Sequence, residues 1–375
     1  MSTPVRLITP TFPPPDEVAA DYAAIVASGV FSNGGSFEQR FSAALATWVG
    51  PAASVSLVTN ATAALELALQ AAVGASSNRH RVLVPSFTFA AGPLTVMRAG
   101  LEPLFVDVDP ETWQPSLADA RAALDRHADV AAILLTSTFG VANEAIAEWE
   151  DLAHAHSVPL VVDSAAGFGS RYPWGEPLGA RGDCEVFSLH ATKTLAVGEG
   201  GAIVSRNPDL IARVEQLKNF GFDSTRASVV LGTNAKLSEL SCAIGLRQLG
   251  RLADRLRARQ AILVRYRSRL EDLGVVFQPG ADSAAIPFVS ALLPTAAARD
   301  ALVAALDAEL VQCRIYYNPP VHHHDVFAQH RGQRALPATE DVAARIISLP
   351  MADDLADQAI DRVARAASGI ALTTR

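Results

Sequence analysis

The sequence places one lysine, Lys193, among uncharged residues, where its amine could act as a nucleophile. Lys193 lies within residues 186–201, V-F-S-L-H-A-T-K-T-L-A-V-G-E-G-G, where a short alternating strand is followed by uncharged, mostly apolar residues. A desolvated lysine loses its proton more easily, and the neutral amine is a nucleophile that condenses with an aldehyde. On this stretch alone a second interpretation is equally open, in which the ammonium of a loop lysine stays in water.

A carboxylate at the end of an apolar strand is the second candidate. Asp163 ends V-P-L-V-V-D and is followed by S-A-A-G-F-G. A carboxylate buried there is costly unless it meets a cation or several hydrogen-bond donors. Lysines hold pyridoxal phosphate as a Schiff base, and an aspartate paired with its protonated pyridine nitrogen keeps that ring electron-accepting. Asp163 could instead cap the next turn or bind a metal ion.

A helix start provides the third candidate. The β-branched run S-V-S-L-V-T at 54–59 leads directly into N-A-T-A-A-L-E-L-A-L-Q-A-A at 60–72, so a strand feeds a helix through a tight connection. The free N–H groups at such a helix N-terminus suit a phosphate. No G-x-G-x-x-G or Walker motif accompanies them, and Asn60 or Thr62 could simply cap the helix.

These candidates require a sheet that brings them together. Near-continuous apolar strands are predicted at 54–59, 81–85, 103–108, 131–138, 159–165, 185–189 and 201–205, most of them separated by helical patterns such as 116–124 and 144–156. This order predicts an α/β fold with a mostly parallel seven-stranded sheet covered by helices on both faces. Ligands of such sheets lie beyond the carboxyl ends of the strands. The residues at those ends are Asn60, Phe89, Thr138, Asp163 and Ser188, with Lys193 just after.

The sequence changes character after about residue 250. A long helix is expected from about 237 to 270, joining the two parts of the chain. Beyond Gly274 the pattern predicts strands within 275–279 and 286–293, a helix at 295–310, a strand near 314–317, and helices near 340 and at 355–368. We therefore expect a large domain over 1–250 and a smaller α+β domain over 251–375.

Composition restricts the class of partner. The 375 residues are 50% hydrophobic and 19% charged, with a net charge of -8, so we expect no nucleic acid or membrane partner and a small ligand held by local donors. The three cysteines, Cys184, Cys242 and Cys313, are far apart and fit reduced thiols. Because no signal-like start or apolar run of about 20 residues occurs, we expect a soluble, cytoplasmic protein.

Taken together, the chain resembles the DegT-type (StrS-like) sugar aminotransferases, a branch of the fold-type-I pyridoxal-phosphate enzymes. The likeness covers essentially the whole chain and implies the two-domain fold of that class. It is carried, in family order, by N-A-T-A-A-L, P-S-F-T-F-A-A, P-L-F-V-D-V-D-P-E-T, V-V-D-S-A-A-G-F-G, F-S-L-H-A-T-K-T-L-A-V-G-E-G-G, N-F-G-F, G-T-N-A-K-L-S-E-L-S-C-A-I-G and I-S-L-P-M.

The resemblance assigns roles to individual residues. It implies that Lys193 forms the Schiff base and moves the proton between substrate carbon and cofactor, and that Asp163 pairs with the pyridine nitrogen. The remaining cofactor contacts implied are Ala61, Thr62 and Ser188 at the phosphate, Phe89 on the ring, and Asn234 in a loop that crosses to the neighbouring subunit's phosphate. A homodimer with shared active sites is therefore implied.

The resemblance also implies a reaction, the transfer of an amino group from L-glutamate to a keto sugar. The closest likeness is to members acting on nucleotide-linked (dTDP- or GDP-) 4-keto-6-deoxyhexoses, as in deoxyamino-sugar or O-antigen lipopolysaccharide synthesis. A cyclitol (scyllo-inosose-type) aminotransferase and a regulatory protein that binds the cofactor without transamination remain as alternatives. The residues expected in the substrate pocket are Ser32, Asn33, Tyr316, Tyr317 and His322, with Lys236 at anionic ligand groups. The two tyrosines could equally be core aromatics, and Lys236 could be solvated.

Four features bear on this assignment. Ala166 stands where relatives commonly place Gln or His near the ring hydroxyl of the cofactor, and Ala61 replaces a glycine. Lys193 itself argues against the family's dehydratases, which carry histidine there. Histidines 322–324 are adjacent, and adjacent side chains of an extended chain point to opposite sides. Because no H-E-x-x-H motif or cysteine partner accompanies them, we expect no metal site.

Overall fold

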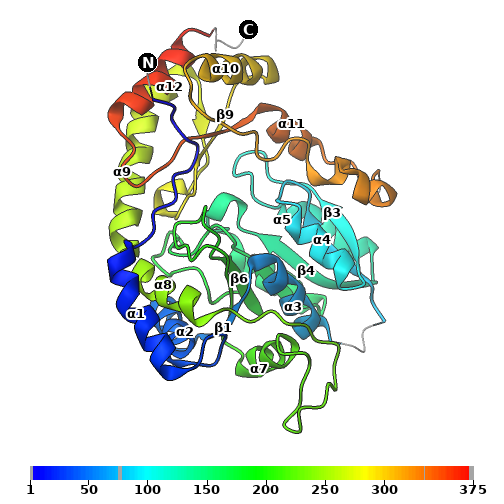
Figure 1. The fold of residues 1–375 in the computed structure, drawn as a ribbon. Helices are drawn as coiled ribbons and strands as arrows, with labels where there is room; N and C mark the ends of the chain where they lie inside the picture. Colours follow the sequence, from blue (N-terminus) through cyan, green and yellow to red (C-terminus); the bar gives the residue numbers. More distant parts are fainter. Residues whose placement is uncertain (1–2, 75–77, 333, 371–375) are drawn as a thin grey trace.

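A computed structural model gives the structure of this protein and describes residues 3–74, 78–332 and 334–370. Figure 1 shows a large lobe built around a sheet and a smaller lobe beside it, which includes helix α12 (Asp357–Ser368). None of the described helices is both long and apolar enough to cross a membrane.

The large lobe contains the expected seven-stranded sheet. Its strands are β1 (Ser54–Val58), β2 (Arg81–Pro85), β3 (Glu102–Val106), β4 (Val130–Thr136), β5 (Leu160–Asp163), β6 (Cys184–Ser188) and β7 (Gly201–Ser205). Their spatial order is β1-β7-β6-β5-β4-β2-β3, with β7 antiparallel to both of its neighbours and the other pairs parallel. The prediction of a mostly parallel seven-stranded sheet is confirmed.

Helices cover both faces of this sheet, as the apolar strands require. One face is packed by α3 (Ala61–Val73), α4 (Ala91–Arg98) and α7 (Pro208–Leu217). The other is packed by α2 (Ser36–Val49), α5 (Leu117–Arg126), α6 (Ile146–Ala155) and α8 (Glu239–Leu249), with α1 (Pro15–Ser28) against α8. Because six of the seven strands run the same way, their carboxyl ends form one edge, which carries the predicted site residues.

The smaller lobe is built on a three-stranded antiparallel sheet of order β10-β9-β8. Its elements are α9 (Leu252–Leu270), β8 (Val276–Phe277), β9 (Val289–Leu292), α10 (Ala296–Ala308), α11 (Pro337–Arg345), β10 (Ile346–Leu349) and α12. Short 3-10 turns lie at Thr138–Gly140, Glu271–Leu273, Ala281–Ser283, Val321–His323 and Asp325–His330. Leu7 and Ile8, near the start of the chain, also contact this lobe through Met351.

Two local predictions were wrong. The helix expected over 237–270 is two helices, because α8 ends at Leu249 and α9 begins at Leu252, after Gly250 and Arg251. The strand expected near 314–317 is reduced to a single bridge between Arg314 and Ser348. The rings of Tyr316 and Tyr317 pack instead among the aromatic residues between the lobes. Strand β10 was not predicted, because I-I-S-L is too short to distinguish from a helix end.

Candidate functional site

Helix α3 presents its N-terminus at the carboxyl edge of the sheet. Asn60 caps the helix by accepting a hydrogen bond from the N–H of Ala63 at 2.8 Å. The N–H groups of Ala61 and Thr62, in the first turn, have no intrahelical acceptor. Gly201 of β7 lies directly beneath, where an added Cβ would come within 2.7 Å of the Asn60 carbonyl oxygen. The capping role of Asn60 is therefore real, and it leaves an anion-binding helix end available.

Asp163 ends β5 at the same edge. Its side chain is buried, and its Oδ1 accepts a hydrogen bond from the N–H of Ala165 at 3.0 Å. Burial raises the pKa of Asp163 to about 6, against the opposing effects of that hydrogen bond and of the charge on Lys193. A carboxylate held this way gains most from a cation placed beside it.

Lys193 lies in the loop between β6 and β7, which folds back on itself through the Leu189–Val197 and Ala191–Gly198 backbone pairs. Burial lowers the pKa of Lys193, while the charge of Asp163 raises it. The two predicted catalytic groups are thus close enough to influence each other electrostatically. An amine with a lowered pKa has the reactivity expected of a nucleophile.

The smaller lobe fixes this loop beside the lysine. The Thr194 hydroxyl donates to the carbonyl of Ala285 at 3.0 Å, and the buried Arg255 guanidinium donates to the Thr194 carbonyl at 3.2 Å. Arg255 also donates to the carbonyl of Thr11 at 2.9 Å and pairs with Asp353 at 3.4 Å. In the sequence Arg255 belongs to an Arg-rich helix that looks solvated, and the groups it contacts come from distant parts of the chain.

Three predicted residues lie around this pair. The N–H of Ser188 donates to the Ala165 carbonyl, and its hydroxyl accepts from the N–H of His190 at 3.2 Å. Phe89 exposes 60% of its surface, although the sequence predicted a ring-stacking role, and its ring centroid lies 6.3 Å from that of Tyr317. Burial raises the pKa of Tyr317 and the charge of Asp163 adds to the effect, so Tyr317 faces the same carboxylate.

A second buried carboxylate supports the Asp163 segment and was missed by the sequence analysis. Glu185 of β6 accepts hydrogen bonds from the Ser164 hydroxyl and, at 2.5 Å, from the N–H of Gly179. Ser164 also shares a hydrogen bond with Ser137 at 2.8 Å. Burial raises the pKa of Glu185 to about 7, opposed by these hydrogen bonds. A glutamate within the apolar strand C-E-V-F-S was the available signal.

The loop that contains Ser32 and Asn33 is anchored by a residue that the sequence analysis did not single out. The buried Glu239, at the start of α8, accepts hydrogen bonds from the N–H groups of Gly35, Phe37 and Glu38 at 2.9–3.2 Å. Ser32 is exposed and its hydroxyl contacts the Asn33 side chain at 3.2 Å. Their assignment to a substrate pocket stays a prediction.

Asn234 and Lys236 lie in the long loop between α7 and α8 that extends away from the body in Figure 1. Asn234 is exposed, and Lys236 donates to the Asn219 side chain at 3.2 Å and lies 4.5 Å from the Phe220 ring centroid. Burial, followed by the charge of Lys218, lowers the pKa of Lys236. The segment returns beside the end of β1, where Lys236 forms a backbone bridge with Val58 and the N–H of Thr59 donates to the Ala235 carbonyl at 2.8 Å. The cofactor and substrate roles of Asn234 and Lys236 stay predictions.

The C-terminal candidates separate into two groups. Tyr316 packs on Phe288 with ring centroids 5.2 Å apart, which makes it partly a core residue. His322 is buried, with Nδ1 2.5 Å from the Ser86 hydroxyl and Nε2 2.9 Å from Glu340. Both of its ring nitrogens face protein atoms, and the predicted contact of His322 with a sugar stays a prediction.

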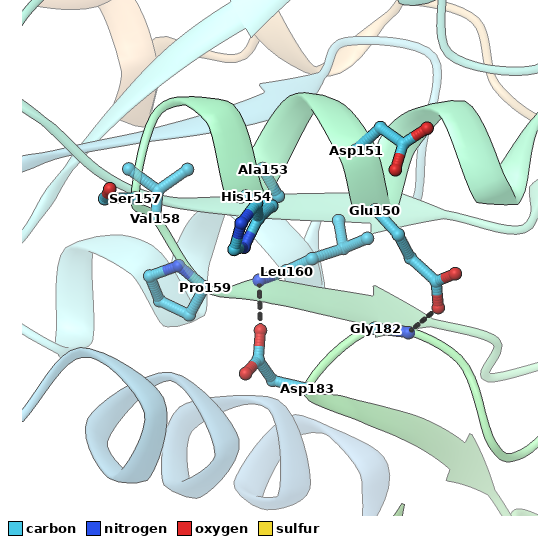
Figure 2. Close-up of a pocket in the computed structure, with 10 residues that line it drawn as sticks. All are labelled: Glu150, Asp151, Ala153, His154, Ser157, Val158, Pro159, Leu160, Gly182 and Asp183. Carbon is cyan, nitrogen blue, oxygen red and sulfur yellow. Dashed lines mark hydrogen bonds between the residues drawn. The ribbon is translucent and has the colours of Figure 1, made fainter.

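The described surface also has a recess of about 750 Å³, which lies away from all of these residues (Figure 2). It is lined by the end of α6 and the amino ends of β5 and β6, and so it lies at the opposite edge of the sheet from Asp163. Two of its carboxylates hold backbone groups, because Asp183 accepts from the Leu160 N–H and Glu150 accepts from the Gly182 N–H. We therefore place the site at the carboxyl edge.

The residues at the carboxyl edge fit pyridoxal phosphate, the cofactor that the sequence predicts. A helix end with free N–H groups suits its phosphate. The buried Asp163, with one oxygen hydrogen-bonded to Ala165, suits its protonated ring nitrogen. Lys193, with its lowered pKa, suits the aldehyde. The position of Ala166, part-exposed and lacking a polar group, offers nothing to the ring hydroxyl.

Comparisons with known proteins agree with this geometry. Residues 15–368 match the model of the DegT/DnrJ/EryC1/StrS aminotransferase family. Protein Rv3402c of Mycobacterium tuberculosis (strain ATCC 25618 / H37Rv) is 44% identical over 96% of this chain and 89% of its own length. The dTDP-4-amino-4,6-dideoxy-D-glucose transaminase of Shigella dysenteriae is 28% identical over 97% and 98%. The GDP-perosamine synthase of Escherichia coli O157:H7 is 31% identical over 81% and 82%.

Solved structures are similar along nearly the whole chain. A protein of Bacillus cereus ATCC 10987 assigned as a PLP-dependent aminotransferase superposes with a TM-score of 0.91, at 28% identity over 98% of this chain and 100% of its own. DesI, solved in the presence of its TDP-sugar product, superposes with a TM-score of 0.87, at 33% identity over 98% and 92%.

Proposed function

The chain belongs to the DegT/DnrJ/EryC1/StrS aminotransferase family, and on that premise we propose that it transfers the amino group of L-glutamate to a nucleotide-linked keto-deoxysugar. It is an aminotransferase of the type that acts on nucleotide sugars, and its cofactor is pyridoxal phosphate. The observation that carries the proposal is the arrangement at the carboxyl edge of the sheet, where the free N–H groups of α3, the buried Asp163 and the part-buried Lys193 follow the ends of β1, β5 and β6.

The cofactor, when bound, supplies an aldehyde that takes up an amino group and a ring that accepts electrons from the neighbouring carbon. We assign its phosphate to the first turn of α3, at Ala61 and Thr62, together with Ser188. We assign its ring to the space between Phe89 and Asp163, whose carboxylate would hold the proton on the ring nitrogen.

Lys193 has two tasks in this proposal. Its Nζ would hold the aldehyde of the cofactor at rest, and the freed amine would take the proton from the substrate carbon and return it two atoms along, beyond the transferred nitrogen. The lowered pKa leaves the free amine able to accept that proton. The hydrogen bonds of Thr194 to Ala285 and Arg255 keep the amine in position during both transfers.

The substrate class rests on the relatives. Proteins similar over most of this chain are named for dTDP- and GDP-linked amino-deoxysugars. We therefore propose a dTDP- or GDP-4-keto-6-deoxyhexose as amino acceptor, which gives a deoxyamino sugar of the kind found in O-antigens. Ser32, Asn33, Tyr316 and Tyr317 are the proposed pocket residues, with Lys236 at the anionic nucleotide.

We further propose that two chains share their active sites in a homodimer. The support is the loop between α7 and α8, which exposes large apolar side chains on a protruding segment, with Leu231 exposed by 89%, Val229 by 56% and Phe220 by 43%. Exposed apolar groups gathered in one segment mark a contact surface. Asn234, in the same loop, would then reach the partner's cofactor phosphate.

The proposed location is the cytoplasm. The buried free thiols of Cys184 and Cys242 are consistent with that location, because reduced cysteines are usual there.

A direct assay tests the proposal. Purified enzyme loaded with cofactor is incubated with L-glutamate and, separately, with dTDP- and GDP-linked 4-keto-6-deoxyhexoses or a cyclitol ketone. Formation of 2-oxoglutarate together with the amino sugar is the expected result. Turnover of the cyclitol ketone alone would overturn the assigned substrate. A visible absorbance that no amino donor alters would overturn transamination itself in favour of a binding protein.

A further inference from the structure

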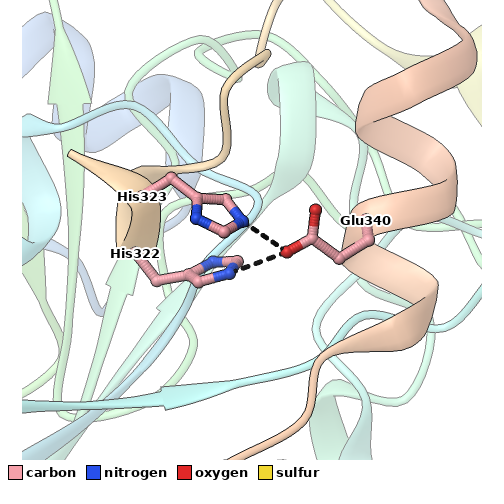
Figure 3. Close-up of side chains that lie close together, drawn as sticks. All are labelled: His322, His323 and Glu340. Carbon is pink, nitrogen blue, oxygen red and sulfur yellow. Dashed lines mark hydrogen bonds and ion pairs between the residues drawn. The ribbon is translucent and has the colours of Figure 1, made fainter. Parts of the chain in front are cut away.

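Three side chains of types that bind transition metals meet in the C-terminal part of the chain (Figure 3). The Nε2 of His322 lies 2.9 Å from Glu340 Oε1, and the Nε2 of His323 lies 2.6 Å from the same oxygen. All three potential ligand atoms lie within 4.8 Å of one another. Two imidazoles and one carboxylate form a donor set that zinc prefers in proteins.

The local backbone explains why two adjacent histidines face one point. The expectation that their rings diverge assumed an extended chain, but Val321–His323 form a 3-10 turn. The turn brings the two ring centroids to 4.1 Å, with the ring planes 40° apart, and both rings face α11. The expected divergence of the His322 and His323 side chains, one of the two reasons for expecting no metal site, was therefore wrong.

His322 has a hydrogen-bond partner at its second ring nitrogen, as histidines that bind metals usually do. Its Nδ1 lies 2.5 Å from the Ser86 hydroxyl, which also accepts from the His322 N–H at 3.3 Å. A partner at Nδ1 fixes the ring orientation and leaves Nε2 for a ligand role, as in many zinc sites. The positive charge of Arg331 is unfavourable for a nearby cation. Its guanidinium, however, donates to the backbone carbonyls of His322 and His323 and so helps to hold the turn.

We propose that His322, His323 and Glu340 bind one Zn²⁺ through two Nε2 atoms and one carboxylate oxygen, with water in the fourth position. Ligand atoms of a tetrahedral zinc ion lie about 3.3 Å apart, given bonds of about 2.0–2.1 Å. The observed separations of 2.6 and 2.9 Å would have to open by about half an ångström. His323 and Glu340 are 40% and 48% exposed, so these side chains can adjust and an ion can enter.

The ion would join segments that are separate in sequence. His322 and His323 follow the segment of Tyr316 and Tyr317, Glu340 belongs to α11, and Ser86 lies directly after β2. Tyr317 faces Asp163, so the ion would fix one wall of the proposed site without taking part in the reaction. In the competing account, neutral imidazoles donate their Nε2 hydrogens to Glu340 and no metal binds.

Metal titration separates these accounts. Tag-free, cofactor-loaded protein stripped with a chelator is titrated with Zn²⁺ against a chromophoric chelator. We expect one equivalent to bind and to raise the thermal midpoint. Loss of an outer-shell partner weakens metal binding by about 10–100-fold, so His323→Gln and Glu340→Gln, which remove direct ligands, should weaken it by about 100-fold or more.

His324→Gln provides the matched control. This residue is the next histidine along the chain, and its Nε2 faces the Pro319 carbonyl rather than Glu340, so its loss should leave zinc affinity unchanged. His323→Gln changes a part-exposed side chain, so the variant should fold. The visible spectrum of the bound cofactor verifies that the variant is folded. Absence of a one-to-one complex at micromolar Zn²⁺ would overturn the proposal. So would equal zinc affinity in His323→Gln and the unaltered protein.

Discussion

Replacing Asp163 by asparagine should stabilise the cofactor-free protein while impairing the enzyme. The side chain is 6% exposed, and burial raises its pKa from 3.8 to about 6. Below about pH 3.8 the folded and unfolded states both hold the proton. Between about pH 3.8 and 6 the folded state binds more protons, so stability falls as pH rises. Above pH 6 the full cost of the buried charge is present.

The size of this cost follows from the pKa shift. A shift of about 2 units corresponds to roughly 3 kcal/mol at pH 8. The amide oxygen introduced by Asp163→Asn would keep the acceptor for the Ala165 N–H without the charge, so the gain should approach that value. With an unfolding entropy of about 2.1 cal/mol/K per residue, 3 kcal/mol raises the thermal midpoint by about 4 °C.

Calorimetry of cofactor-free protein at pH 8 and near pH 4.5 measures both the gain and its pH dependence. The variant should unfold later at pH 8, and the difference should shrink at the lower pH. With cofactor bound, the cationic ring would favour the ionised carboxylate, so Asp163→Asn should lower kcat by about 10²-fold or more. A cofactor-free variant no more stable than the unaltered protein at pH 8 would refute the argument, because Asp163 would then carry no buried charge.

Three further predictions concern the residues around this carboxylate. Lys193→Ala should abolish turnover and the visible absorbance of lysine-bound cofactor, and measurable transamination in that variant would contradict the assignment. Gly201→Ala places a Cβ within 2.7 Å of the Asn60 carbonyl and should displace the start of α3, to which the cofactor phosphate is assigned. Cofactor affinity, measured by fluorescence titration, should therefore fall by about tenfold or more. Gly250→Ala is the matched control, because the atom nearest to its added Cβ is 3.5 Å away. Arg255→Met leaves the Thr194 and Thr11 carbonyls without their donor, so urea unfolding should show a loss of about 2–4 kcal/mol, whereas the exposed Arg257→Met should change stability by less than about 1 kcal/mol.

Local patterns were sufficient to predict the sheet and the position of the site. Strands such as L-V-V-D are apolar throughout because helices cover both faces, and a polar residue at the end of each marks the edge where ligands bind. Lys193 and Asp163 were therefore recognisable from sequence, and the structure brings them within electrostatic reach. Their catalytic roles await the experiments above.

Predictions failed where long-range contacts decide the outcome. Arg255 and Glu239 look like solvated helix residues in sequence, and only the packing of distant segments buries them. The segment at 314–317 has β-forming residues, but its tyrosines gain more by packing on Phe139 and Phe288 than by extending a small sheet. The convergence of His322 and His323 on Glu340 depends on a turn that the sequence does not announce.

The anchoring of the lysine loop by the smaller lobe has a mechanical consequence. Lys193 belongs to the large lobe, yet its neighbour Thr194 is held from across the boundary by Ala285 and Arg255. Any hinge rotation of one lobe against the other must therefore displace the reactive nitrogen as well.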